Sequence, residues 1–210
     1  MQYLFSYAKY DIMRKTYCNT PRNVIKYSYI RDHGGTCMTN DINGINAELA
    51  ALLLKKGLYI SSAESCTGGL FSAYLTAVPG ASEFFKESIV TYSNEAKMRE
   101  LGVKAETLSS VGAVSAETAK EMAQGIRRHT GADIGVGITG IAGPGGGTAE
   151  KPVGTVYICV SSDLYEKTEL LKSNSTDREG IRRDTCIQAF RSALKAAALY
   201  PDAEKQEKQS

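Results

Sequence analysis

Apolar side chains recur at two spacings along this chain, one typical of helices and the other of strands. Together with glycine and proline stops, the helical spacing predicts five helices: residues 43–56, 67–78, 93–102, 115–130 and 177–199. Runs rich in β-branched and aromatic side chains predict five strands: residues 58–63, 88–92, 132–139, 153–161 and 165–172. Helices and strands therefore alternate through most of the sequence.

This alternation predicts an α/β fold with helices on both faces of a mixed central sheet, which is a three-layer α/β/α arrangement. The near-continuous apolar run of residues 132–139 is typical of a strand in the middle of such a sheet. A chain of 210 residues is long enough for a single domain with a full core. We expect that domain to span residues 40–200 and the polar tail, residues 201–210, to be disordered.

Residues 1–39 differ from the rest in charge and in pattern. They hold six Lys or Arg and two Asp, a net charge of +4, and half of the twelve tyrosines, but no clear helical or strand period. The segment contains neither the apolar core of a secretory signal nor a run long enough to cross a membrane. Its tyrosine content is unusual for a transit peptide, so a disordered extension or a start upstream of a natural one at Met38 is favoured.

The composition of the remaining residues limits the classes of function. They carry 19 basic and 21 acidic side chains and lack the basic stripe of a nucleic-acid-binding protein. Five widely spaced cysteines without a CxxC pair form neither a disulfide framework nor a zinc site, and the chain has two histidines. We therefore expect a cytoplasmic homo-oligomer that takes a small-molecule substrate and binds no metal, other cofactor, nucleic acid or membrane.

Three predicted strands run into turns rich in glycine and small polar residues: AESCTGG at 63–69, TYSNEAK at 91–97 and GITGIAGPGGG at 137–147. The carboxyl ends of strands are where active sites gather in open α/β sheets. Each segment also has a purely structural explanation: a helix cap, a solvated lysine and a surface loop. Their shared position at strand ends favours one common site.

Serine and lysine residues in these turns suggest nucleophilic chemistry. A serine hydroxyl needs a base, and the main domain offers no suitable histidine, because His129 lies at a helix end beside two arginines. Lys97 can be that base if burial or a nearby cation lowers its pKa, and it lies one helical turn after Ser93. Ser65 is then the nucleophile. Backbone N–H groups of residues 66–68, expected at a helix N-terminus, would stabilise an oxyanion.

The three motifs, with GAVS at residues 112–115, resemble the C-terminal domain of the CinA family, also known as PncC-type nicotinamide-nucleotide amidases. The similarity runs from about residue 45 to 199, and the order and spacing of the motifs are those of the family. The resemblance implies hydrolysis of nicotinamide mononucleotide to nicotinate mononucleotide and ammonia, in pyridine-nucleotide salvage. It also implies a Ser–Lys pair that works without a metal, which matches Ser65 and Lys97.

The resemblance implies roles for residues around this pair as well. Tyr92 is expected to belong to the catalytic set. The expected substrate-binding residues come from all three motifs and from the C-terminal segment: Thr67, Gly68, Gly69, Asn94, Thr139, Gly140, Gly143, Gly145 and Arg178. Among them, the glycine loop and Arg178 are expected to hold the nucleotide phosphate.

Two other interpretations stay open. One is a non-catalytic nucleotide-binding module in DNA uptake or damage response, which would need the same pocket but not Lys97. The other keeps the hydrolase and makes Cys66 the nucleophile, since a thiol at a helix N-terminus becomes acidic and reactive. No histidine accompanies Cys66, and neighbouring side chains in a tight turn generally point in different directions. The serine is therefore favoured.

Overall fold

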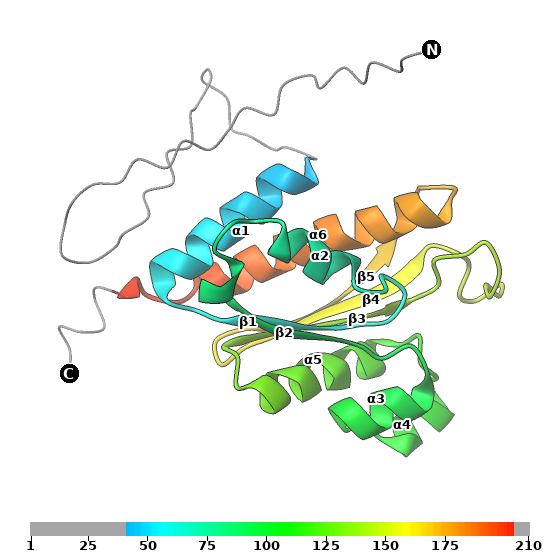
Figure 1. Cartoon of the computed structure of the whole chain (residues 1–210). Coiled ribbons are helices and arrows are strands. Elements are labelled where there is room, and N and C mark those ends of the chain that lie inside the picture. The colour runs from blue at the N-terminus through cyan, green and yellow to red at the C-terminus, as the bar shows by residue number, and fades with distance from the viewer. Residues whose placement is uncertain (1–40, 204–210) are drawn as a thin grey trace, which may run out of the picture. The chain divides into compact units, whose positions relative to one another are not determined.

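Five strands form the centre of the structure, a computed structural model that describes residues 41–203 (Figure 1). The strands are β1 (Ile60–Glu64), β2 (Phe85–Val90), β3 (Ile134–Gly140), β4 (Thr155–Ser161) and β5 (Glu166–Lys172). They lie in the order β2-β1-β3-β4-β5. β1 pairs in parallel with β2 and β3, whereas β4 pairs antiparallel with β3 and β5, so the sheet is mixed.

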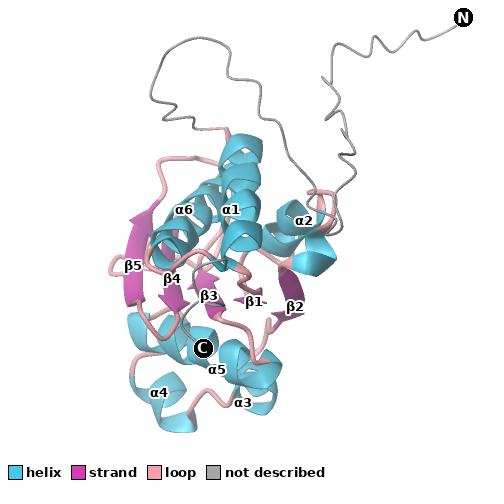
Figure 2. Cartoon of the chain, turned by 90° about the vertical axis from the view of Figure 1, so that its left-hand side faces the viewer, coloured by secondary structure: helices cyan, strands magenta, loops and turns pink. Residues whose placement is uncertain are grey.

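Helices cover both faces of this sheet (Figures 1 and 2). The α-helices are α1 (Ile42–Lys56), α2 (Leu70–Thr76), α3 (Asn94–Leu101), α4 (Ala105–Ser110), α5 (Ala116–Thr130) and α6 (Arg178–Ala198), with a 3-10 turn, η1 (Ala81–Glu83), before β2. α1, α2 and α6 lie on one face of the sheet, and α3, α4 and α5 lie on the other. The predicted three-layer α/β/α fold of a single domain is confirmed.

The larger apolar core lies between the sheet and the helix pair α1 and α6. Aromatic side chains fill part of it: Phe71 of α2 stacks on Phe190 of α6 with ring centroids 4.5 Å apart. A smaller core lies on the other face, where Met122 and Ile126 of α5 are fully buried. Because α1 and α6 are the first and last helices of the described domain, the larger core closes only when the two ends of the domain meet.

α5 packs unusually close to β3 because two glycines of the strand leave room for it. A Cβ atom at Gly137 would overlap the carbonyl of Ala119 and the backbone of Ala123, and one at Gly135 would overlap the carbonyl of Ala123. No side chain separates helix from strand at these positions. The strand that enters the glycine-rich loop is thus held directly against a helix.

The structure differs from the predicted elements in three places. The helix expected over residues 67–78 begins three residues later, because Gly68 and Gly69 have φ angles of 58° and 91°, in the left-handed region outside the α-helix. β2 ends at Val90, so Tyr92 lies beyond the strand. Finally, the six-residue helix α4 was not predicted, since so short a segment shows little periodicity.

The ends of the chain fall mostly outside the described residues. This applies to the extension 1–39 and to all but the first three residues of the tail that begins at residue 201. In that first part of the tail, Asp202 pairs with Lys55 of α1 at 3.0 Å. None of the helices in residues 41–203 is long and apolar enough to cross a lipid bilayer.

Candidate active site

The carboxyl ends of β1, β2 and β3 lie side by side at one edge of the sheet. Glu64, the last residue of β1, pairs in register with Val90 of β2 and with Ile138 of β3. The three motif segments leave the sheet at this edge, as the sequence predicts for parallel strands. Side chains that are far apart in the sequence can therefore meet there.

Ser65 and Lys97 are in hydrogen-bond contact at this edge. Lys97 Nζ lies 3.1 Å from Ser65 Oγ and 2.7 Å from the carbonyl oxygen of Thr91. Ser65 directly follows β1, and Lys97 comes from the first turn of α3. Ser93 caps that helix by accepting the N–H of Ala96 at 3.1 Å, which fixes where the helix starts. The predicted approach of Lys97 to the strand end is observed.

The surroundings of Lys97 favour its neutral form. Its side chain is only 1% exposed, and among residues 41–203 no carboxylate lies within ion-pair distance of it. Burial lowers the pKa of Lys97, because removing an ammonium group from water penalises the charged form. A neutral amine has a lone pair that can accept the hydroxyl proton of Ser65. The arrangement therefore suits a nucleophile and its base.

The turn after Ser65 supplies fewer backbone donors than the sequence suggested. It precedes α2 rather than belonging to it, so the expected donors at a helix N-terminus are wrong for this segment. Gly68 also donates its N–H to the carbonyl of Ser65 at 3.0 Å and is not free for a substrate. Within the described chain, the N–H groups of Cys66 and Thr67 have no oxygen acceptor. These two groups remain as donors for an oxyanion.

Cys66 lies next to Ser65 but lacks the properties of a nucleophile. Its side chain is 5% exposed and belongs to the larger apolar core. Burial raises the pKa of the Cys66 thiol to about 12, outweighing a smaller lowering by adjacent backbone N–H groups and by Lys97. A thiol with this pKa stays protonated at neutral pH and reacts slowly. The geometry thus favours serine over cysteine.

Tyr92 and Arg178 are in contact with each other, and Tyr92 follows Thr91, whose carbonyl accepts from Lys97. Tyr92 is 64% exposed, and its hydroxyl accepts an N–H of Arg178 at 3.3 Å. The same guanidinium donates to the carbonyl oxygen of Gly143 at 2.8 Å. The structure therefore joins Tyr92, Arg178 and the glycine loop, but it shows no hydrogen bond from Tyr92 to Ser65 or Lys97.

Two other expected substrate-binding residues make contacts within the fold, and a third is buried. The Thr139 hydroxyl is buried and donates to the carbonyl of Ala113 at 2.7 Å, which supports the turn before α5. Gly140 packs against Thr155, where a Cβ atom would lie 2.8 Å from that carbonyl oxygen. The Thr67 hydroxyl is buried and has no hydrogen-bond partner among the described residues.

The remaining expected residues lie on the surface near the site. Asn94 is exposed at the first position of α3, and Gly145 is exposed in the glycine loop with open space around its Cα. Gly69 is half-buried immediately before α2, where an added Cβ would lie 3.7 Å from Val90. Asn94 and Gly145 leave their backbone accessible to a ligand, whereas the Gly69 N–H donates to Glu64.

Comparison with protein families assigns the domain. The family described as the CinA C-terminal domain matches residues 42–197, about three quarters of the chain and all of the main secondary structure. The chain belongs to the CinA family. The expected boundaries of the family similarity, about residues 45 and 199, lie within a few residues of the matched range.

Relatives of this CinA domain carry names that describe induction rather than chemistry. A competence-damage inducible protein of Clostridium acetobutylicum is 58% identical over 134 residues, which are 64% of this chain and 32% of that protein. A CinA-like protein of Endomicrobium trichonymphae is 49% identical over 175 residues, 79% of this chain and 40% of the relative. The chain thus spans about a third of the length of the curated relatives it matches.

Solved structures of similar proteins support the fold. The crystal structure of a competence/damage inducible protein from Agrobacterium tumefaciens superposes with a TM-score of 0.73 at 38% identity, covering 78% of this chain and 99% of that one. A CinA superfamily protein from Klebsiella pneumoniae gives the same TM-score at 33% identity, covering 77% and 100%. The fold of this CinA domain is therefore that of a whole, separately crystallised protein.

Two residues that support the site were missed by sequence reasoning. The Glu64 carboxylate is fully buried and accepts backbone N–H groups from Gly69 and from the first turn of α2. Arg182 of α6 donates two N–H groups to the carbonyl of Thr67. Glu64 could have been noticed as a charged residue at the end of an otherwise uncharged strand. Arg182 carried no signal, because its partner lies 115 positions away.

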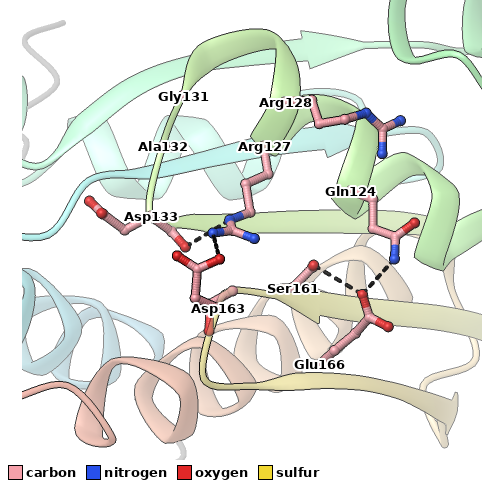
Figure 3. Close-up of a pocket in the computed structure, with 10 residues that line it drawn as sticks. Gln124, Arg127, Arg128, Gly131, Ala132, Asp133, Ser161, Asp163 and Glu166 are labelled. Atoms are coloured by element: carbon pink, nitrogen blue, oxygen red, sulfur yellow. Dashed lines mark hydrogen bonds and ion pairs between the residues drawn. The ribbon is translucent and has the colours of Figure 1, made fainter.

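A hollow of the described CinA domain lies away from this site (Figure 3). It has a volume of about 660 Å³ and is formed at the other edge of the sheet, before β3 and after β4. Several of its polar groups already have partners: Arg127 contacts Asp163 and the carbonyl of Asp133, and Glu166 accepts from Gln124 and Lys120. None of the site residues predicted from the sequence lines it. Among the described side chains, no group of three His, Cys, Asp or Glu could hold a metal ion.

Proposed function

We propose that this CinA domain hydrolyses the carboxamide of nicotinamide mononucleotide to nicotinate mononucleotide and ammonia. The observation that supports this proposal best is the contact between Ser65 Oγ and Lys97 Nζ at 3.1 Å, with the lysine buried and without a carboxylate partner in residues 41–203. A buried lysine at a serine hydroxyl is expected of a serine hydrolase. The choice of substrate rests on the resemblance of the three motifs to PncC-type amidases.

In the first half of the reaction, neutral Lys97 takes the hydroxyl proton as Ser65 Oγ attacks the carboxamide carbon. The carbonyl oxygen becomes an oxyanion, which the N–H groups of Cys66 and Thr67 can stabilise. When the tetrahedral intermediate collapses, the ammonium group of Lys97 returns its proton to the leaving nitrogen. Ammonia departs, and the acyl group stays on Ser65 as an ester.

In the second half, the same base activates water. Lys97, neutral again, takes a proton from a water molecule, whose oxygen attacks the ester carbon. Collapse breaks the bond to Ser65 Oγ, and Lys97 gives the proton back to the serine. The Thr91 carbonyl, 2.7 Å from Nζ, holds the amine at the reacting oxygen through both halves. The products are the free acid and the unchanged enzyme.

A cationic side chain at the glycine loop, Arg178, suits an anionic substrate. Arg178 spans Tyr92 and the carbonyl of Gly143, and its guanidinium can turn to a phosphate as a charged fork. The glycine loop is anchored by Lys151, whose Nζ donates to the carbonyls of Val111 and Val114 at 3.0 and 2.7 Å. We assign phosphate binding to Arg178 and the exposed backbone of this loop.

Ammonia release from nicotinamide mononucleotide tests the proposal. Wild-type protein should release ammonia, Ser65→Ala should lose nearly all turnover, and Cys66→Ala should keep much of it, because the thiol is buried and protonated. Circular dichroism of both variants checks that the fold is intact. Loss of activity in Cys66→Ala with retention in Ser65→Ala would reverse the assignment of the nucleophile.

The alternative function is a non-catalytic nucleotide-binding module, which the names of the relatives accommodate. Such a module would bind nicotinamide mononucleotide without releasing ammonia, and Lys97→Met would leave its affinity unchanged. Calorimetric titration of the nucleotide into wild type and Lys97→Met, beside the ammonia assay, separates the two functions.

A further inference from the structure

The carbonyl oxygen of Thr67 receives two hydrogen bonds from one distant side chain. Arg182 donates to it from Nε at 3.1 Å and from Nη2 at 2.6 Å. In the described chain no carboxylate lies within ion-pair distance of this guanidinium. A charged, two-pronged donor is thus directed at one neutral backbone atom, two residues after the nucleophile.

The rest of the turn is held at its other groups. Ser65 donates its N–H to the carbonyl of Ile138 at 3.0 Å, which ties the start of the turn to β3. Glu64 accepts the N–H of Gly69 at 2.9 Å, and also those of Phe71 and Ser72, which ties the end of the turn to β1. In the middle of the turn, the Thr67 carbonyl accepts the N–H of Leu70 at 3.1 Å and the two donors of Arg182, and through Arg182 this part of the turn is tied to α6.

The middle of this turn is also its softest part. Gly68 and Gly69 occupy the left-handed region, where glycine has easy access to several backbone conformations. Rotation of the peptide between Thr67 and Gly68 would turn the Thr67 carbonyl away and break the hydrogen bond from the Gly68 N–H to the Ser65 carbonyl, which would loosen the turn that carries the N–H groups of Cys66 and Thr67. The carbonyl cannot rotate in this way without losing both hydrogen bonds from Arg182 and the one from the Leu70 N–H.

We propose that Arg182 is a positioning residue for the nucleophile turn: by fixing the Thr67 carbonyl, it keeps the N–H groups of Cys66 and Thr67 directed at the oxyanion formed on attack by Ser65. It contacts neither the base nor the reacting oxygen. The inference rests on the proposed role of Ser65, but it does not depend on which amide is the substrate.

Replacing Arg182 by Met removes both donors and keeps an unbranched apolar stem. We expect kcat for ammonia release to fall on the order of 10- to 100-fold, as for misplaced or lost oxyanion donors. KM should stay within about threefold, and the midpoint of the pH–rate profile should not move, because neither substrate binding nor Lys97 is altered. Arg182→Lys, which keeps the charge and one donor, should recover part of kcat.

Arg183→Met is the matched control, since Arg183 is the next residue of α6, is exposed and does not contact the turn. It should behave as wild type. Unchanged kcat in Arg182→Met overturns the proposal, and so does a raised KM with normal kcat, which would make Arg182 a substrate-binding residue. An equal loss in the control also overturns it. Should the methionine variant fail to fold, wild-type kcat in a folded Arg182→Lys overturns it instead.

A substrate-independent measurement separates this inference from the proposed function. A fluorophosphonate forms an O–P bond with an activated serine, fluoride leaves, and the hydroxyl proton passes to the base; intact-mass spectrometry gives the rate. Labelling of wild type at Ser65 that slows tenfold or more in Arg182→Met supports the positioning role, even if nicotinamide mononucleotide is not hydrolysed. Equal labelling of the two overturns it. Absence of labelling in wild type overturns it together with the assignment of Ser65.

Discussion

At the scale of single residues, burial of Lys97 lowers the stability of the folded domain and favours the neutral, reactive form of its amine. A lysine that is 1% exposed, with no carboxylate partner in the described domain, loses its hydration without gaining an ion pair. Its hydrogen bonds to Ser65 and to the carbonyl of Thr91 recover part of that loss. The same desolvation that is unfavourable for folding makes the neutral amine available for catalysis.

The pH dependence of the rate should report this desolvation. Burial lowers the pKa of Lys97, so kcat/KM should rise with pH along one ionisation that lies below about 10.4, the value for free lysine. Lys97→Arg should be nearly inactive at every pH, because a guanidinium keeps its proton and cannot act as a base. Initial rates of ammonia release between pH 6 and about pH 10 measure both. Substantial activity of the arginine variant would show that Lys97 acts only through its charge.

Replacing Lys97 by an apolar residue should increase the free energy of unfolding by an amount that depends on pH. Since the pKa of Lys97 is lowered in the folded state, the unfolded chain binds more protons between the two values, and stability rises with pH across that window. Below the window the lysine is charged in both states, and the full desolvation cost applies. Lys97→Met should therefore raise the free energy of unfolding on the order of 1 kcal/mol near pH 7. Urea titrations should show this gain shrinking toward pH 10; a constant gain would contradict the mechanism.

At the scale of elements, glycines decide how the strands and helices meet. Gly137 lets α5 rest directly on β3, with Ala119 and Ala123 against the strand backbone. The helix in turn covers the second apolar core. Close packing at this point is therefore a condition for placing the strand end that enters the glycine loop.

Adding one methyl group at Gly137 tests this close packing. Gly137→Ala would push α5 from β3, and we expect it to lower the free energy of unfolding by about 1–3 kcal/mol, as for an overpacked core. Gly145→Ala is the control, because a Cβ there meets nothing within 4 Å and φ is not in the left-handed region. Chemical denaturation compares the two variants. Equal stability of Gly137→Ala and wild type would mean that the helix can shift without cost.

Features set by local periodicity could be predicted from the sequence, whereas backbone angles and contacts set by helix docking could not. The meeting of three strand ends at one edge of the sheet follows from the local apolar pattern and from parallel pairing, both of which can be predicted from the sequence. The approach of Lys97 to Ser65 follows from the same features. The start of α2 was misplaced because apolar spacing does not report the backbone angles of Gly68 and Gly69. The contact of Arg182 with Thr67 could not be predicted, since it depends on how α6 docks and on no local spacing.

At the scale of the whole molecule, the site is assembled from almost the full length of the domain. Ser65, Lys97, Gly143 and Arg178 come from four separate segments joined by the sheet and by α6. α6 also closes the larger core against α1. Activity and overall folding should therefore be inseparable.

A chain that ends before α6 tests this dependence. Termination after residue 176 removes Arg178, Arg182 and the apolar side chains that cover α1 and α2, such as Phe190. We expect this chain to be insoluble or unfolded rather than a folded protein with a weakened site. Soluble expression and near-uniform amide protection in hydrogen exchange would contradict the prediction.

The packing of the first helix on the last also has a consequence during protein synthesis. When α1 leaves the ribosome, the helix that will cover its apolar face has not yet been translated, and at about 5–20 residues per second it appears only many seconds later. Until then, the nascent chain exposes a hydrophobic surface, and the turn that carries Ser65 lacks its contact with Arg182. Nascent-chain chaperones should consequently bind this protein until α6 emerges, and the proposed hydrolase activity should appear only after release.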